Sequence, residues 1–471
     1  MTSRYQYYRY TTSDNYLLFN YSHQYFTDFI HQRMFSKGII SLCCYLVLSF
    51  FICHVSAQQI TWSQHIAPII HRNCTPCHRQ GEAAPFSLLT YEEVAKRASF
   101  IKRVTESHYM PPWKPDPHYV KFANERKLTE EEIRLIGEWA EHGMPRGEST
   151  DKEATPSYVS GTLFNRQPDL VLKMKSSYVL KGDNVERFIV YKMPFELPDS
   201  VAVEAIEFTS NNRKVIHHAN YEIDDVPDAD LYNTADYVDN TESHLDYYQQ
   251  YVSYRKKMKY FGGWIPGSSY ESYPDDMGWI MPKRGVVLLT VHYAPVGKDE
   301  EVISGVQFFF KKKPVKRQIK ATTYGSGGLG EKDIEPFFYI PANVEKSFKV
   351  NVKITETQSL MYVWPHMHLL GKTFKAYAVT PEKDTIRLVS IPQWDFNWQE
   401  IYWFPKLIKI PKGTVLTIEG TYDNTVNNAS NPSFPPQLVY GAMRTKDEMM
   451  TMILMTIPYE NGDEEREIKR K

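Results

Sequence analysis

Hydrophobic and polar positions follow two different periods along the chain. Between residues 58 and 147, apolar side chains recur at helical spacing, as they do from Trp62 to Asn73. From about residue 161 onward the pattern changes to short alternating runs that Pro, Gly, Asn and Asp punctuate. Such runs occur at 188–191, 286–291, 348–352 and 415–418. We therefore expect one small helical domain followed by a large all-β region.

The last predicted helix has recognisable ends. Thr129 and Glu132 have the spacing of a capping box at its start. Gly143 can end the helix, and Pro145 lies just beyond. One apolar face lies between these signals, formed by Ile133, Ile136, Trp139 and Ala140.

The β region is large for one sandwich, and its length of about 310 residues fits two. The basic, Pro-containing stretch from Lys311 to Arg317 is the expected join. The Tyr-rich, charged stretch from Ala229 to Lys259 is expected to be a long surface insertion. The predicted order is an N-terminal extension with signal peptide at 1–57, a helical domain at 58–147, a linker at 148–164, β-sandwiches at 165–316 and 317–462, and a charged tail at 463–471.

The start of the chain carries an export signal. The stretch Met34 to Ala57 has a basic residue, Lys37, then an apolar run and the small-residue site Val55-Ser56-Ala57, as a secretory signal peptide does. We expect a periplasmic or extracellular protein cleaved near Ala57, with an uncleaved membrane anchor as the alternative. Residues 1–33 are polar and Tyr-rich, so either translation starts at Met34 or the chain has a cytoplasmic extension.

Charge and cysteine usage narrow the function classes. The formal net charge of the 471 residues is -1, which gives no reason to expect nucleic-acid binding. Three of the five cysteines lie in the apolar N-terminal stretch. Cleavage would leave Cys74 and Cys77 alone, so disulfides are not expected in the β region.

Those two cysteines belong to the sequence Cys74-Thr75-Pro76-Cys77-His78. Two thiols at this spacing, followed by an imidazole, are the signature of covalent c-type haem attachment. A disulfide, a zinc half-site and a thioredoxin-like pair are the alternatives, and the lack of a second cysteine pair disfavours zinc. Met110, followed by two prolines, is the expected second axial ligand of the iron, with His108 as its rival.

The segment 58–147 resembles a class I cytochrome c. This resemblance implies one haem c, attached through Cys74 and Cys77, with His78 and Met110 as the axial ligands of its iron.

Histidines of the β region fall into three short motifs: His217-His218, His292, and His366-Met367-His368. Residues i and i+2 share one face of a strand, so His366 and His368 can bind one metal ion. Adjacent residues point to opposite faces. His217 and His218 can therefore bind one ion only at a strand end or bulge, or through different ring nitrogens.

One methionine extends this set. Met449, in Asp447-Glu448-Met449, precedes an apolar run. A thioether together with imidazoles favours copper over zinc or iron.

The order of these motifs resembles the type II copper, ascorbate-dependent monooxygenases, which include peptidylglycine alpha-hydroxylating monooxygenase and dopamine beta-monooxygenase. The resemblance spans about 165–460 and implies two all-β jelly-roll sandwich domains after the small all-α cytochrome c domain. It also implies two coppers. The ligands of the electron-transfer copper would be His217, His218 and His292, and those of the oxygen-activating copper would be His366, His368 and Met449.

The chain departs from that family in three respects. Animal members use disulfides in these domains, where this chain has no cysteine. Peptide-amidating members have an Arg just before His-x-His and a Tyr shortly after the ligand Met, where this chain has Trp364 and Ile453. Peptide amidation is therefore disfavoured, and an apolar or aromatic substrate would suit Trp364 better.

We accordingly expect a copper-dependent monooxygenase that hydroxylates a C–H bond with O2, with electrons supplied through the fused haem domain, whose tether gives it a high effective concentration. Expected partners are O2, a small-molecule or peptide substrate, and a periplasmic electron donor, either a cytochrome or a quinol-linked or ascorbate-like reductant. The alternative is a non-catalytic copper and haem electron-transfer protein or a copper-handling protein. A haem peroxidase is disfavoured, because a methionine ligand leaves no open position on the iron.

Overall fold

The computed structural model describes residues 59–149, 162, 164, 166–225, 236–241, 258–266, 268, 270–274, 276–442 and 444–468. The predicted extension and signal peptide lie outside the described residues, as does most of the predicted linker. Contacts group Ile60–Lys471 into one unit. Within the described ranges, no helix combines the length and the apolar character needed to cross a membrane.

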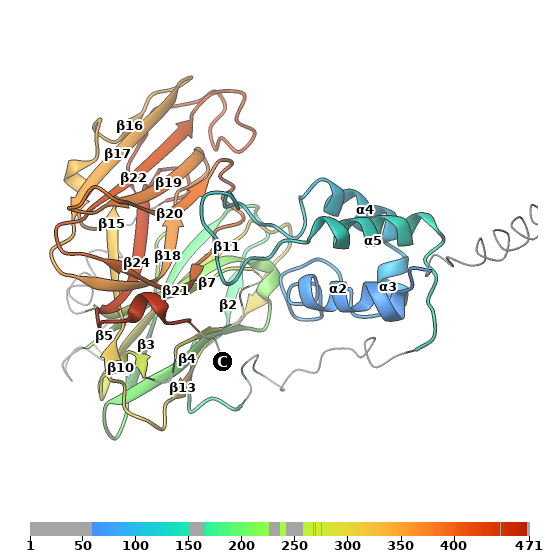
Figure 1. Ribbon diagram of the computed structural model, residues 1–471, viewed down its shortest axis with the longest axis horizontal. Helices are drawn as coiled ribbons and strands as arrows, with labels where there is room; N and C mark the ends of the chain where they lie inside the picture. The colour runs from blue at the N-terminus through green and yellow to red at the C-terminus, as the bar shows by residue number, and fades with distance from the viewer. Residues whose placement is uncertain are drawn as a thin grey trace, which may run out of the picture. The chain divides into compact units, whose positions relative to one another are not determined.

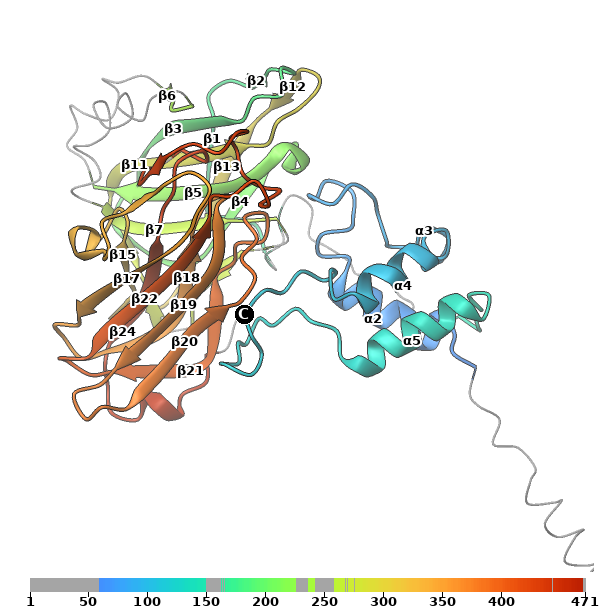
Figure 2. The same ribbon diagram turned by 90° about the horizontal axis from the view of Figure 1, so that it is seen from above.

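The N-terminal described part is helical. A π-helical turn, η1 (Trp62–Ile66), runs directly into α2 (Ala67–Asn73). The remaining helices are α3 (Tyr91–Ala95), α4 (Ala98–Glu106) and α5 (Glu130–Glu141). In both ribbon views α2 to α5 lie together (Figure 2), and their apolar faces share one core around Trp62 and Trp139.

Helix α5 begins and ends as its sequence predicts. The Thr129 side chain accepts the backbone N–H of Glu132, and the Glu132 carboxylate accepts the N–H of Thr129, which confirms the capping box. Gly143 follows the helix with a φ of +79°, a conformation that glycine adopts without strain. Local chemistry therefore sets both ends of this helix.

The first β half contains two five-stranded sheets, ordered β1-β13-β4-β10 with β8 on β4, and β6-β3-β11-β5-β7. Their apolar faces enclose one core. The strands are β1 (Leu170–Lys173), β2 (Tyr178–Leu180), β3 (Arg187–Glu196), β4 (Val201–Ser210), β5 (Ile216–Asp224), β6 (Tyr237–Asp239), β7 (Met258–Trp264), β8 (Glu271–Ser272), β9 (Met277–Gly278), β10 (Ile280–Met281), β11 (Arg284–Tyr293), β12 (Glu300–Val302), β13 (Ser304–Phe310) and β14 (Arg317–Gln318).

The second β half contains two four-stranded sheets, ordered β15-β24-β18-β21 and β17-β22-β19-β20. Its strands are β15 (Lys320–Gly325), β16 (Tyr339–Ile340), β17 (Glu345–Lys353), β18 (Gln358–His366), β19 (Gly371–Val379), β20 (Thr385–Ile391), β21 (Tyr402–Ile410), β22 (Val415–Asp423), β23 (Val439–Tyr440) and β24 (Thr451–Pro458). The described chain is thus mostly β-sheet with few helices, as the hydrophobic pattern predicts. Jelly-roll connectivity and the domain boundaries stay predictions.

One described part of the predicted surface insertion is a strand instead. Tyr237–Asp239 forms β6, which pairs with Ile189–Tyr191 of β3. Val238 is buried in that position while its two neighbours are exposed. These three residues of the predicted surface insertion therefore form a strand of the sheet. Residues 242–257 of the insertion lie outside the described part.

The sheet β15-β24-β18-β21, whose labelled strands can be followed in Figure 1, is buried on both faces. Along β24, Met455 and Ile457 pack into the core of the first half, whereas Met452 and Leu454 pack into the core of the second. A strand that is buried on both faces reads as a continuous apolar run instead of an alternating one. This shared sheet joins the two β halves through side chains.

A buried ion pair reinforces the joint between the halves. Arg317 in β14 donates from Nη1 to Oδ1 of Asp463 at 2.8 Å, and both side chains are buried. Ser359 Oγ and the backbone N–H of Glu460 donate to Asp463 Oδ2 at 2.5 and 3.0 Å. Ile468 is buried in the core of the first half. The described part of the charged C-terminal stretch is therefore packed against the sheets.

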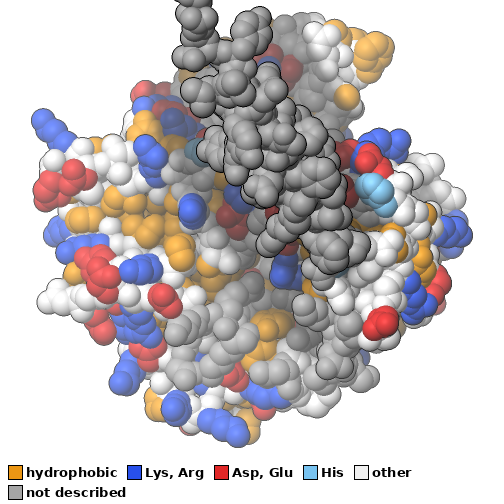
Figure 3. Space-filling model, turned by 45° about the vertical axis from the view of Figure 1, so that its right-hand side comes forward, with side chains coloured by type: hydrophobic (Ala, Val, Ile, Leu, Met, Phe, Trp, Pro, Cys, Tyr) orange, Lys and Arg blue, Asp and Glu red, His pale blue; other side chains and the backbone are white. Residues whose placement is uncertain are grey.

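The face of the molecule drawn in Figure 3 carries charged side chains of both signs. On the face drawn in Figure 3, acidic and basic side chains are interspersed, with hydrophobic side chains gathered between them. This agrees with the near-neutral net charge of -1.

Replacing Asp463 by Asn should lower the free energy of unfolding by about 3 kcal/mol, because the buried Arg317 guanidinium loses its counter-ion. Burial opposes ionisation of Asp463, yet the hydrogen bonds from Arg317 and Ser359 lower its pKa to about 2. Since the folded-state pKa is depressed, the stabilisation should be complete above about pH 4 and should decline as the pH falls towards 2. Urea unfolding of both proteins across this pH range measures the difference.

The matched control is Asp299→Asn, which removes an exposed pair with Lys181. Exposed pairs contribute little, so its effect should stay below about 1 kcal/mol at every pH. Equal effects of the two substitutions at neutral pH would show that the Arg317–Asp463 pair does not stabilise the joint.

Candidate metal sites

A β-bulge brings the adjacent histidines His217 and His218 to one site. In the β5–β11 ladder, His218 lies opposite His292 and Ile216 lies opposite Tyr293. His217 is therefore the extra residue of the bulge, which turns its side chain towards the same region as that of His218. Among the described residues, these three histidines are the one group of three or more His, Cys, Asp or Glu side chains whose ligand atoms lie within 4.8 Å of one another.

The ring nitrogens of this first group are available for a cation. The Nδ1 atoms of His217 and His218 are 3.3 Å apart. His292 is fully buried, and neither of its ring nitrogens has a hydrogen bond in the described part of the chain. Its Nε2 faces Oε1 of Glu186 at 3.5 Å, which leaves Nδ1 as the open donor. Buried polar atoms without partners are costly, and a metal ion would satisfy them.

The protonation of these rings also suits metal binding. Burial and the nearby His292 lower the pKa of His217 to about 4. The same two causes hold the pKa of His218 well below its ordinary value. Both imidazoles are neutral at physiological pH, which is the form that binds metals.

The second group lies where β18 ends. His366 is the last residue of that strand, and His368 lies just beyond its end, so the shared-face argument for a single strand does not describe both residues. Their ring centroids are nevertheless 5.0 Å apart. His366 Nδ1 donates to Oε1 of Gln399, and His368 Nδ1 donates to the carbonyl of Asp447 at 3.0 Å. Each ring therefore keeps Nε2 free as a ligand atom.

The backbone of Met449 is tied to that of His368 through the side chain of Glu448. The buried Glu448 carboxylate accepts the backbone N–H groups of His368, Leu370 and Met449 at 2.9, 2.6 and 3.2 Å. Burial raises the pKa of Glu448 to about 8 in spite of these bonds. The register of β18 and β24 sets His366 opposite Thr451, two residues after Met449. Two imidazoles and one thioether are a donor set that fits copper.

The two groups are neighbours, although they come from different β halves. The ring centroids of His218 and His366 are 6.2 Å apart. Phe396 stacks on His217 at 4.6 Å and lies 5.9 Å from His368. One buried cluster therefore contains all five predicted imidazole ligands.

The predicted haem residues line one cavity of about 380 Å³. Cys74 and Cys77 are free thiols, and burial together with Cys77 raises the pKa of Cys74 to about 12. His78 Nδ1 bonds the carbonyl of Phe86 at 3.1 Å, which fixes the ring and leaves Nε2 open. This space is surrounded by two thiols, an oriented imidazole and Met110. Such a set fits a covalently attached haem.

The same cavity distinguishes the rival ligands and reaches the first histidine group. Met110 lines it, whereas His108 is exposed and does not. Its far wall includes His217, Asn397 and Trp398. The Cys-His motif and a predicted copper ligand thus face one space.

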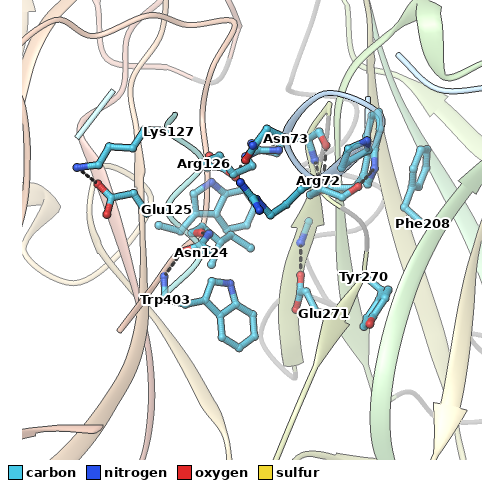
Figure 4. Close-up of a pocket in the computed structure, with 18 of the residues that line it drawn as sticks. Arg72, Asn73, Asn124, Glu125, Arg126, Lys127, Phe208, Tyr270, Glu271 and Trp403 are labelled. Atoms are coloured by element: carbon cyan, nitrogen blue, oxygen red, sulfur yellow. Dashed lines mark hydrogen bonds and ion pairs between the residues drawn. The ribbon is translucent and has the colours of Figure 1, made fainter. Parts of the chain in front are cut away.

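A second cavity, of about 630 Å³, is drawn in Figure 4. Its aromatic lining includes Trp264, Trp364 and Trp403. Glu271 at its wall accepts hydrogen bonds from Tyr221, Tyr260, Tyr273 and the backbone N–H of Gly263. Burial raises the pKa of Glu271. Trp364 lies two residues before His366 on β18, so the cavity wall and a predicted ligand share one face of that strand.

Comparison with known proteins bears on the second β half. Residues 335–461 match the family model for the copper type II ascorbate-dependent monooxygenase, C-terminal domain. This stretch is a copper monooxygenase-like module. It contains His366, His368 and Met449, and the family is copper-dependent.

The other comparisons are weak. No curated protein matches the chain. The infectious bursal disease virus VP2 subviral particle is 10% identical, covering 63% of this chain and 74% of that chain, with a TM-score of 0.18. The PBSX exported protein XepA is 11% identical, covering 64% and 99%, with a TM-score of 0.16. TM-scores this low carry no argument about fold or function.

Several residues around the imidazoles were not predicted from the sequence. Phe396, Asn397 and Gln399 come from a loop, and Glu186 lies before β3. Their side chains are ordinary for loops and carry no periodic signal. Glu448 belongs to the Asp-Glu-Met motif, but its bonds to the backbone of His368 and Leu370 join distant segments and leave no local signal in the sequence.

Replacing His292 by Ala should remove one of two bound copper ions per chain, because the first group loses its fully buried donor. Atomic absorption after dialysis against copper measures the ratio, and circular dichroism checks the fold. His142→Ala, at the exposed end of α5, should keep both ions. If the His292→Ala variant still binds two copper ions per chain, His292 is not a copper ligand.

Proposed function

We propose that the chain is an exported copper-dependent monooxygenase that hydroxylates a C–H bond with O2, using electrons delivered through a c-type haem. The observation that carries the proposal is the single cluster that the histidines of both β halves form. In it, the ring centroids of His218 from the first half and His366 from the second are 6.2 Å apart. The family match to the half that contains His366 supports copper as the metal.

In the proposed reaction, R–H, O2, two electrons and two protons give R–OH and water. Copper, when bound, supplies the one-electron redox chemistry with O2. One ion would be held by His217, His218 and His292, and a second by His366, His368 and Met449. The neutral state of the buried imidazoles keeps their donor atoms free, and Glu448 holds the backbone of His368 and Met449 together.

The proposed route for electrons starts in the helical part. A haem c, when attached at Cys74 and Cys77 with His78 and Met110 on its iron, supplies one-electron transfer. His217 lines the same cavity as these residues, which supports a short path to the first histidine group. A periplasmic cytochrome or a quinol-linked or ascorbate-like reductant is the proposed donor, reached after export through the segment Met34 to Ala57.

We further propose that the aromatic cavity of Figure 4 takes the substrate. Its volume of about 630 Å³ is typical of small-molecule sites. The side chains of Trp264, Trp364 and Trp403 suit an apolar or aromatic body. Trp364 itself offers no positive charge, but Arg72, Arg79, Arg126 and Lys127 also line the cavity, so an aromatic substrate that carries an anionic group would fit it as well.

A copper-dependent rate of O2 uptake tests the catalytic proposal. With candidate aromatic substrates and a reductant, the full chain should consume O2 only when copper is present. Met449→Leu keeps nearly the same volume but removes the thioether, so uptake should fall by at least 100-fold with little change in stability. Oxygen-electrode traces before and after copper loading give both rates.

Met450→Leu is the matched control, because Met450 is an adjacent buried methionine whose side chain belongs to the core of the second half. It should retain most of the uptake. Equal rates for the two variants would exclude Met449 as a ligand, and copper binding without any O2 uptake would favour the copper-carrier alternative.

The electron route has a separate test. A Cys74→Ser, Cys77→Ser variant should lose covalent haem, seen as the loss of haem staining in a denaturing gel. Uptake driven by a protein donor should disappear with it. Uptake driven by a small reductant that reaches copper directly should persist, and its loss as well would contradict separate roles for the two parts.

A further inference from the structure

A six-residue segment between β20 and β21, Asp395–Glu400, contacts both histidine groups. We call it the bridging segment. Phe396 at its centre lies 6.0 Å from His292 and 6.4 Å from His218, in addition to its contacts with His217 and His368. Trp398 reaches the cavity that Cys74 and Cys77 line.

Asn397 acts on the first group. Its Nδ2 donates to Oδ1 of Asp395 at 3.2 Å, which fixes the orientation of the amide. Its Oδ1 therefore faces Nε2 of His217, at 3.2 Å. Because an amide oxygen only accepts, the proton of His217 must lie on Nε2. The unprotonated Nδ1 is then the atom that faces Nδ1 of His218.

Gln399 acts on the second group in the same way. Its Nε2 donates to the carbonyl of Phe396 at 2.9 Å, so the amide orientation is again fixed from within the segment. Its Oε1 accepts from Nδ1 of His366. The proton of His366 is thereby held on Nδ1, and Nε2 is left as the ligand atom.

Ion pairs fix the two ends of the segment. Asp395 pairs with Lys114 at 3.1 Å, and Glu400 pairs with Arg126 at 2.5 Å. Both partners lie in the segment between Met110 and α5. This segment also contacts β21, because Asn124 Oδ1 accepts a hydrogen bond from the backbone N–H of Trp403. The amides of Asn397 and Gln399 are therefore held between fixed ends, as a positioning element requires.

We propose that Asn397 and Gln399 are positioning residues that select the metal-binding nitrogen of His217 and of His366 respectively, so that one short segment orients an imidazole at both metal sites. This inference rests on the proposed function for the identity of the metal. Outer-shell partners of this kind typically contribute 10–100-fold to metal affinity.

The test uses the full chain with copper removed and then restored. Asn397→Leu and Gln399→Leu each remove the acceptor, whereas Asn397→Asp and Gln399→Glu keep an oxygen in its place. Copper affinity is measured by competition with a chromophoric chelator, and the Cu(II) electron paramagnetic resonance spectrum is recorded for each protein. Asn351→Leu, on the outer strand β17, is the matched control.

Each Leu variant should lower the affinity for one copper ion about 10–100-fold and leave the affinity for the other unchanged. It should also alter one component of the spectrum. The component affected by Asn397→Leu should differ from the one affected by Gln399→Leu. The Asp and Glu variants keep the acceptor oxygen but lose the N–H that donates to Asp395 or to the carbonyl of Phe396. They should therefore bind copper less tightly than wild type but more tightly than the Leu variants, which a purely structural loss would not produce. Asn397 is exposed, so its variant should fold even if the buried Gln399 variant does not.

Two results would overturn the inference. If both Leu variants have the same copper affinities and spectra as the control, the two amides do not select the metal-binding nitrogen of either histidine. Equal losses in the Leu and the acidic variants would show a packing role instead. If the wild-type chain binds no copper at all, the proposed function fails first, so the two failures are distinguishable.

Discussion

The shared sheet β15-β24-β18-β21 is buried on both faces, and the positions of the candidate metal ligands depend on it. Its strands pack into two cores at once, so neither half can shift without exposing apolar side chains such as Met455 or Leu454. The register pairs His366 with Thr451, and just before that strand the Glu448 carboxylate accepts the backbone N–H groups of both His368 and Met449. A slip by one residue would turn every side chain of a strand to the other face and would separate these groups.

Burying five imidazoles in one cluster requires that each ring nitrogen has a role. His217, His366 and His368 each give one nitrogen to an oxygen acceptor in the protein. Among the remaining nitrogens, Nδ1 of His217 and Nδ1 of His218 lie 3.3 Å apart, and a buried nitrogen without a partner is costly. His292 shows this most clearly, because its ring is fully buried, its Nε2 has only Glu186 at 3.5 Å, and its Nδ1 has no hydrogen-bond partner in the described part of the chain. The protein thus accepts a local cost that a bound cation would offset.

Local patterns in the sequence predicted much of this architecture, and contacts between distant residues account for the rest. The capping box at Thr129 is local, and so was the argument that His217 and His218 require a bulge. The apolar runs predicted strands at β3 and β11, but both strands have continuous buried stretches, so the expected alternation is wrong for them. The burial of Val238 could not be predicted, because a single apolar residue within a polar stretch produces no hydrophobic periodicity. The bridging segment has loop composition, and only the fold brings it between two strands that lie far apart in sequence. Haem attachment and export stay predictions.

The central claim is that the Cys-His cavity and the histidine cluster form one electron path. Anaerobic stopped-flow mixing tests it directly: the copper-free chain, with its haem reduced, is mixed with Cu(II) while the haem absorbance is followed. The account predicts rapid oxidation of the haem in the wild-type chain and none in a His217→Ala, His218→Ala variant. A haem that stays reduced in the wild-type chain after copper has bound would contradict the account.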